Sequence, residues 1–224
     1  MPKTDVITID GPAGSGKSTI SRLLARKIDR FYLDTGAMYR VVALAASRKG
    51  IPLSDGKRLG EICRFLKLRY MTDEDPPRIF LDNEDISTAI RSPEMDMLAS
   101  EISSVKEVRD AMTELQRKMV RGMRVVAEGR DMGTVVFPGA QHKFFLTASP
   151  EVRAERRYKE MLGRKESVSR EVVRAEMDKR DHQDKTRVLA PLRPAHNAKL
   201  IDSTDLTPDE VVRTILKNLE KGNE

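Results

Sequence analysis

Cysteine and long apolar runs are the scarcest features of this 224-residue sequence. Cys63 is the single cysteine, so the chain cannot form an intramolecular disulfide or a cluster of thiolate ligands. No apolar run approaches the ~18 to 20 residues that a bilayer crossing requires. Residues 1–10 also lack the basic start, the apolar middle and the cleavage site of a signal peptide. We therefore expect a cytoplasmic protein.

Aromatic residues are also few, at 4% of the chain, and tryptophan is absent. Proteins that hold single-stranded nucleic acid stack its bases on aromatic rings, so this composition disfavours such a function. The formal net charge of +6 points to anionic partners, but 41 basic against 35 acidic residues indicate a mixed surface. A hydrophobic content of 39% is enough for the core of one large domain, with or without an insert.

One stretch matches the phosphate-binding pattern G-x-x-x-x-G-K-[ST] at every specified position: Gly11, Pro12, Ala13, Gly14, Ser15, Gly16, Lys17 and Ser18, followed by Thr19. The apolar run 6–10 predicts a strand before this loop, and apolar spacing over 18–28 predicts a helix after it. The backbone N–H groups of such a loop face phosphate oxygens. We expect Lys17 to reach the β- and γ-phosphates of ATP and Ser18 to ligate Mg²⁺. A chance match is the alternative, which the flanking strand and helix disfavour.

Strand and helix patterns alternate along most of the remaining chain. Strands are predicted at 31–34, 124–128, 143–146 and 199–202, a tight polar loop at 129–134, and helices at 93–103, 106–121, 150–163, 169–182 and 207–219. Residues 51–92 differ, because a helix at 60–67 precedes two short alternating segments, 68–72 and 78–82. This pattern predicts a small antiparallel unit inserted into a nucleotide-binding core.

Arginine is placed mainly in the predicted loops and at helix ends: Arg40, Arg109, Arg130, Arg153, Arg156, Arg157, Arg180 and Arg187. Transfer of a phosphoryl group between two anions requires compensating positive charge and the exclusion of water, which closing guanidinium groups supply. The pattern therefore favours a kinase. The N-K-x-D motif that selects guanine is absent, which argues against a switch GTPase. Thr35 and Arg40 follow a strand end where ligands bind, but a helix N-cap and a solvated charge explain them equally well.

Four motifs occur in order: I-T-I-D-G-P-A-G-S-G-K-S-T at 7–19, L-D-T-G-A-M-Y-R at 33–40, G-R-D-M-G-T-V-V-F-P at 129–138, and R-D at 180–181 with A-P-L at 190–192. With these motifs the chain resembles the bacterial cytidylate kinases. The resemblance implies an α/β fold, with a P-loop NTPase-type five-stranded parallel sheet flanked by helices. It further implies one kinase domain with its core at 1–50, 93–150 and 190–224. A small α+β monophosphate-binding insert would lie at about 51–92, and a short arginine-rich lid near 153–165, within 151–189.

The reaction implied by the resemblance is ATP-dependent phosphorylation of CMP and dCMP to CDP and dCDP by direct in-line transfer, with Mg²⁺. A monomer that binds neither nucleic acid nor membrane is expected. Two alternatives stay open: a broader UMP/CMP or other small-molecule kinase, and a nucleotide-switched ATPase that binds nucleic acid.

The resemblance also assigns residues. Catalytic roles fall to Lys17, Arg130, Asp131, Arg157 and Arg187, with Arg156 an alternative to Arg157 as the lid arginine. The CMP-binding set is Thr35, Arg40, Ser100, Arg109, Arg130, Asp131, Arg180, Asp184 and Arg187. Within it, Ser100 and Arg109 resemble the residues that read the cytosine edge, to which a hydroxyl and a guanidinium can offer donors. Family members often have Asp at the position of Glu128, so the relation of Glu128 to Mg²⁺ is left open.

Overall fold

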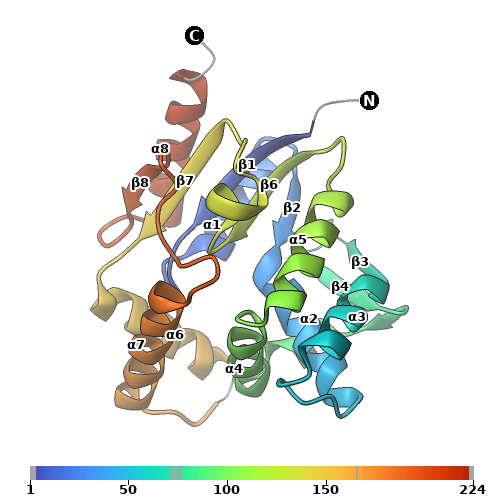
Figure 1. The fold of residues 1–224 in the computed structure, drawn as a ribbon. Coiled ribbons are helices and arrows are strands. Elements are labelled where there is room, and N and C mark those ends of the chain that lie inside the picture. Colours follow the sequence, from blue (N-terminus) through green and yellow to red (C-terminus); the bar gives the residue numbers. More distant parts are fainter. Residues whose placement is uncertain (1–3, 72–73, 75–76, 165, 222–224) are drawn as a thin grey trace. The chain divides into compact units, whose positions relative to one another are not determined.

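The computed structural model describes residues 4–71, 74, 77–164 and 166–221, and the chain divides into two compact units (Figure 1). The smaller unit is Asp34–Gly122, and the larger contains Thr4–Leu33 and the chain from Met123 onward. The predicted strand end Thr72 and the predicted lid end Lys165 lie outside the described residues. Among the helices that the structure describes, none combines the length and apolar character needed to cross a bilayer.

The larger unit is built on a five-stranded sheet of order β2-β6-β1-β7-β8. Its strands are β1 (Asp5–Asp10), β2 (Phe31–Asp34), β6 (Arg124–Gly129), β7 (His142–Thr147) and β8 (Lys199–Asp202). β1 pairs in parallel with β6 and β7, and β7 pairs in parallel with β8. The predicted five-stranded sheet is thus confirmed. Because Asp10 lies opposite Gly129 in the register, the carboxyl ends of β1 and β6 meet at one edge.

The two faces of β1 have different partners because its side chains alternate. Ile7 and Ile9 are fully buried in a core shared with α1 (Lys17–Lys27) and α8 (Pro208–Lys221). The opposite face, which carries Thr8 and Asp10, contacts the short helix η2 (Met132–Val136). The apolar face of β1 therefore packs in the core, and its polar face packs against η2, which follows β6 in the sequence.

The prediction of a polar loop over 129–134 is wrong for its second half, because residues 132–136 form a π-helix, η2. Its wide turn is closed by Phe137, whose N–H donates to the Met132 carbonyl at 2.7 Å. The Asp10 carboxylate accepts from the N–H groups of Met132 and Gly133, both at 2.8 Å. A buried acid 122 residues away in sequence thus satisfies the first amides of η2, and no local pattern encodes such a contact.

Helices α6 (Pro150–Gly163) and α7 (Arg170–Thr186) follow β7 and pack against each other. The predicted start of α6 is confirmed, because the Ser149 hydroxyl accepts from the N–H of Val152 at 3.3 Å. α7 is capped by Ser169 and extends beyond the predicted end at residue 182. Met161, Val173 and Met177 form a small buried core between the two helices.

The smaller unit contains α2 (Thr35–Arg48), α3 (Gly56–Phe65), β3 (Leu68–Met71), β4 (Arg78–Leu81), β5 (Glu84–Asp85), η1 (Ala89–Arg91), α4 (Pro93–Ile102) and α5 (Lys106–Met119). Its three strands pair antiparallel, as the alternating segments predict. Helix α3 begins four residues before its predicted start because the Asp55 carboxylate caps it, accepting from the N–H of Arg58 at 3.1 Å. The boundaries of the predicted insert at 51–92 stay a prediction, since the compact unit extends past both.

The core under β1 should dominate the stability of the larger unit. Leu24 on α1 is fully buried in that core, whereas Leu200 on β8 is 67% exposed. We expect Leu24→Ala to lower the free energy of unfolding by about 2–5 kcal/mol, because it leaves a cavity that the core cannot close. Leu200→Ala is the matched control and should cost less than about 1 kcal/mol. Urea unfolding followed by circular dichroism measures both, and equal losses would contradict this account of the core.

Candidate active site

The phosphate-binding pattern forms a loop between β1 and α1, and its glycines are required by backbone geometry. Gly14 and Gly16 have φ values of 70° and 90°, in the left-handed region that favours glycine. A Cβ atom on Gly11 would lie only 2.0 Å from the carbonyl oxygen of Leu146 on β7. The loop can therefore fold tightly against the sheet only with these residues, and α1 begins directly after Gly16.

Lys17 is buried at the start of α1, where its Nζ donates to the carbonyl oxygen of Pro12 at 2.6 Å. Burial lowers its pKa well below the ordinary value, and the charges of Arg130 and Arg180 act in the same direction. Glu128 and Asp184 oppose them. The ammonium thus lies among other cations with little water, an environment that binding of a polyphosphate would relieve.

A second cluster brings together predicted residues from the end of β6 and from α7. The Nε atom of Arg130 donates to Asp184 at 2.9 Å, and Arg187 lies 3.7 Å from the other carboxylate oxygen. Burial alone would raise the pKa of Asp184, but the charges of Arg130, Arg180 and Arg187 together lower it. Asp131, next to Arg130, is buried. The structure therefore gathers these five predicted residues within the larger unit.

Glu128 is held by two hydroxyl groups. The Ser18 hydroxyl donates to one carboxylate oxygen at 3.0 Å, and the Tyr32 hydroxyl donates to the other. All three residues belong to the larger unit, and Glu128 and Tyr32 are buried. A hydroxyl and a carboxylate are the hard oxygen ligands that Mg²⁺ accepts, so this pair fits the ion. Among the described residues no group of three or more His, Cys, Asp or Glu could hold a metal.

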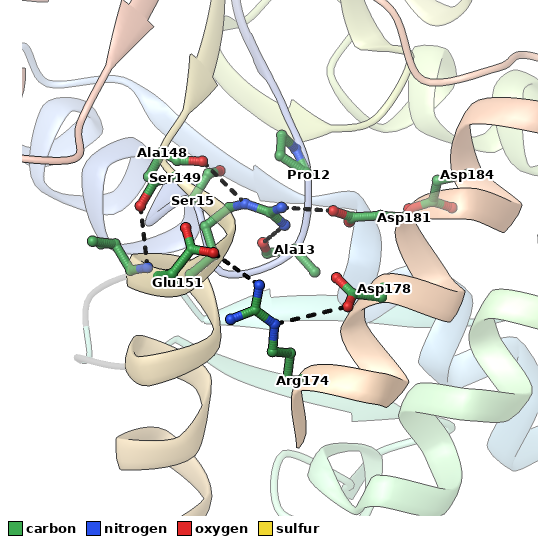
Figure 2. Close-up of polar contacts among 12 residues, drawn as sticks. Pro12, Ala13, Ser15, Ala148, Ser149, Glu151, Arg174, Asp178, Asp181 and Asp184 are labelled. Atoms are coloured by element: carbon green, nitrogen blue, oxygen red, sulfur yellow. Dashed lines mark hydrogen bonds and ion pairs between the residues drawn. The ribbon is translucent and has the colours of Figure 1, made fainter. Parts of the chain in front are cut away.

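Arg153 on α6 ties the phosphate loop to the α6–α7 pair. Its guanidinium donates to the carbonyl oxygen of Ala13 at 3.1 Å and to that of Ala148 at 3.2 Å, and lies 2.7 Å from Asp181 on α7. Figure 2 shows Ala13, Ala148 and Asp181 converging from three segments. A Cβ atom on Gly14 would lie 2.7 Å from the Arg153 carbonyl, so the loop also packs directly on α6. The helices predicted as a lid are thus in contact with the loop.

The two candidate lid arginines have different partners. Arg156 donates to the hydroxyl and the carbonyl oxygen of Ser203, at 2.9 and 2.7 Å. Arg157 donates to Glu160 on the same helix at 3.0 Å, an ion pair three residues apart and open to water on the Glu160 side. Such a surface pair is worth only about 0.3–0.5 kcal/mol, so a stronger anion can displace it. The pair with Glu160 is therefore a weak one, whereas the two contacts of Arg156 with Ser203 tie α6 to the chain after β8.

In the smaller unit, Thr35 and Arg40 lie on the first turns of α2. Asp34, rather than Thr35, is the N-cap, since its carboxylate accepts from the N–H of Ala37 at 2.8 Å. This rules out the capping role that the sequence left open for Thr35, which is buried at the first helical position. Arg40 lies 3.6 Å from Asp34 and 3.3 Å from Asp96, so it is not a simple solvated charge.

Ser100 and Arg109 lie on α4 and α5 of the same unit. Arg109 is 6% exposed, and its Nη1 donates to the carbonyl oxygen of Ser103 at 3.1 Å. Its guanidinium also lies over the ring of Tyr39, 6.0 Å from the centroid. The carbonyl and the ring set the direction of the guanidinium, whose N–H groups are donors of the kind that a carbonyl oxygen or a ring nitrogen accepts.

Two residues of this region escaped prediction as site residues: Asp10 and Tyr32. Asp10 ends β1 directly before the loop, and an acid at a strand end was a usable signal. Tyr32 carried none, because it resembles any strand aromatic. Arg153 is among the arginines that the sequence places near the site, but no local pattern indicates its partners on the phosphate loop and α7.

Comparisons with known proteins identify the family of the chain. A family model described as "Cytidylate kinase" matches residues 7–221. A protein of Citrifermentans bemidjiense named cytidylate kinase is 46% identical over 222 residues, which cover 97% of this chain and 95% of that protein. One of Vibrio cholerae with the same name is 43% identical over 217 residues, covering 97% and 96%.

A solved structure shares the fold at low identity. The crystal structure of an uncharacterized protein from Eubacterium ventriosum superposes with a TM-score of 0.52 and 15% identity, covering 98% of this chain and 99% of that chain. A likeness at this level supports the assignment of fold.

The buried carboxyl of Asp10 should make stability depend on pH. Burial raises the pKa of Asp10 from the ordinary 3.8 of an aspartate to about 6, despite the two amides that favour its charged form. The folded state therefore binds this proton more tightly than the unfolded state, and its stabilising contribution falls as the pH rises from about 4 to about 6. The loss amounts to about 3 kcal/mol.

Between pH 4 and pH 7, we expect the free energy of unfolding of the wild-type protein to fall by about 3 kcal/mol relative to that of Asp10→Asn. Urea unfolding at intervals of pH measures it. Asp205→Asn, the same substitution at an exposed position, is the matched control. A difference for Asp10→Asn that does not vary with pH would refute the assigned cause.

Proposed function

The chain belongs to the cytidylate kinase family, and from this premise we propose how its residues carry out the reaction. It is a nucleoside monophosphate kinase, a phosphotransferase that uses ATP to phosphorylate CMP and dCMP. The observation that carries the proposed mechanism is the concentration of cationic groups around buried Lys17, since the reaction brings together substrates rich in negative charge.

The phosphate loop binds the phosphates of ATP. Residues 11–19 supply backbone N–H groups, and the N-terminus of α1 adds its partial positive charge. Lys17 moves from the Pro12 carbonyl to the β- and γ-phosphates, and it stays protonated there because the anion offsets burial. Arg153 keeps the loop shaped for this role by holding the carbonyl of Ala13 away from the phosphates.

Ser18 and Glu128 are the residues that would hold Mg²⁺, the first directly and the second directly or through water. The ion supplies charge neutralisation of the phosphate oxygens. Tyr32 fixes the orientation of the Glu128 carboxylate by donating to it. The hydrogen bond from Ser18 to Glu128 keeps both side chains in place when no nucleotide is bound.

The cluster at the end of β6 acts on the monophosphate and on the group in transfer. Positive charge comes from Arg130, which has Asp131 beside it, and from Arg187. These guanidinium groups form no covalent bond with the substrate, but they stabilise the negative charge on the oxygens of the transferring phosphoryl group during in-line displacement. Asp184 holds the two arginines in place and, with Arg180, contacts ribose and phosphate. Arg157 exchanges Glu160 for the transferring phosphoryl group.

The smaller unit supplies recognition of the pyrimidine nucleotide. Thr35 and Arg40 bind the 5′-phosphate, and Ser100 and Arg109 donate to the carbonyl and ring nitrogen of cytosine. A buried guanidinium left without its partner costs free energy, so a base with a different edge binds poorly. The assignments of a monomer, a cytoplasmic location and no binding of nucleic acid or membrane stay predictions.

The choice of acceptor tests this function directly. In a coupled assay of ADP release with Mg²⁺ and ATP, we expect kcat/KM for CMP and dCMP to exceed that for AMP and GMP at least tenfold, because purines present a different edge to Arg109. UMP at the rate of CMP would favour the broader kinase. ATP turnover that needs no acceptor at all would overturn the function.

The role of Arg109 can be separated from that of the phosphate loop. Arg109→Met should raise the KM for CMP by at least tenfold, the value of one lost charge-assisted hydrogen bond, and should change the KM for ATP less than about twofold. Arg117→Met, at an exposed position on the same helix, is the control and should change neither. Equal increases in both constants for Arg109→Met would remove its role in reading the base.

A further inference from the structure

A pocket of about 410 Å³ lies in the larger unit on residues that the kinase mechanism does not use. It is lined by Gly133, Thr134, Pro138, Lys143, Arg193, Pro194, Ala195 and His196. These residues come from η2 and the turn after it, from β7, and from the segment between α7 and β8 (Figure 1). The pocket thus opens on the polar face of the sheet, opposite the core under α1 and α8.

The charge of this pocket is of one sign. Lys143 and Arg193 are cationic and His196 can become so, whereas none of the eight described lining residues is acidic. Lys143 is only 8% exposed, and its Nζ donates to the carbonyl oxygen of Pro138 at 2.6 Å. A neutral carbonyl does not balance a buried ammonium, so an anion placed beside it would be strongly favoured.

The pocket also contains a polar group that lacks a partner. The hydroxyl oxygen of Thr134 is buried but has no hydrogen bond among the described residues. Such a group costs about 1–3 kcal/mol unless a ligand or water satisfies it. Gly133 brings this segment close to its neighbours, since a Cβ there would lie 3.2 Å from the Lys143 side chain and 3.3 Å from that of Ala195. The segment that carries this hydroxyl and the side chain of Lys143 therefore meet at the same pocket.

We propose that this pocket binds a small phosphate monoester. Lys143, Arg193 and the Thr134 hydroxyl would hold the phosphate, because guanidinium, ammonium and hydroxyl groups are its preferred donors. The volume exceeds that of a phosphate alone and lies at the lower end of the range for small-molecule sites. Pro138, Pro194 and Ala195 offer apolar surface to the organic part. None of the residues assigned to ATP or CMP lines the pocket, so the site is separate from the reaction.

Glycerol 3-phosphate and inorganic phosphate serve as probes in isothermal titration calorimetry. The full-length protein is first saturated with CMP and a non-hydrolysable ATP analogue, so that the phosphate loop cannot take up either probe. We expect saturable binding of glycerol 3-phosphate, at least tenfold tighter than that of inorganic phosphate. Arg193→Gln should weaken it at least tenfold through loss of a charge-assisted hydrogen bond. Arg213→Gln, at an exposed position on α8, is the matched control and should bind as the wild-type protein does.

Arg193 is exposed, so its replacement should leave the protein folded, which retained kinase activity with CMP will verify. Lys143→Met should also abolish the binding of glycerol 3-phosphate. If this buried substitution prevents folding, the affinity of Arg193→Gln remains the test of the proposal. The absence of saturable heat with the wild-type protein would overturn the proposal. It would also be overturned by unchanged affinity in Arg193→Gln, or by inorganic phosphate binding as tightly as the ester.

Discussion

The crowding of positive charge around a buried lysine is the constraint on which the larger unit depends. Lys17 is closed off from water, and Arg130 and Arg180 add charge of the same sign, against which Glu128 and Asp184 compensate only in part. In a medium of low dielectric constant such an arrangement is costly. The substrates of the reaction carry several negative charges. The cations that repel one another therefore attract the substrates, and this attraction offsets the repulsion.

The rest of the larger unit keeps these cations from moving apart. Asp184 accepts from Arg130 and lies near Arg187, which fixes two guanidinium groups to α7. Arg153 joins the phosphate loop to α6 and, through Asp181, to α7. Helices α6 and α7 and the phosphate loop are thus one connected structure.

Sequence patterns predicted those elements that are determined by residues close to them in the sequence. The apolar run before the loop predicted β1, and Ser149 with a proline after it predicted the start of α6. The π-helix after β6 could not be foreseen, because its first amides are satisfied by Asp10, which is distant in sequence. The same reason hid the role of Tyr32 and the partners of Arg153. A pattern shows that a residue is apolar or charged, but only the tertiary fold selects the partner.

Glu128 shows how neighbouring hydroxyl groups can fix the carboxylate of a long, buried side chain. A glutamate has one methylene more than an aspartate, and in a buried site that extra rotatable bond would let the carboxylate take several positions. The hydroxyls of Ser18 and Tyr32 each bind one of its oxygens, so both ends of the carboxylate are fixed. The two donors come from α1 and from β2, a strand of the sheet, so two different elements set the position of the carboxylate.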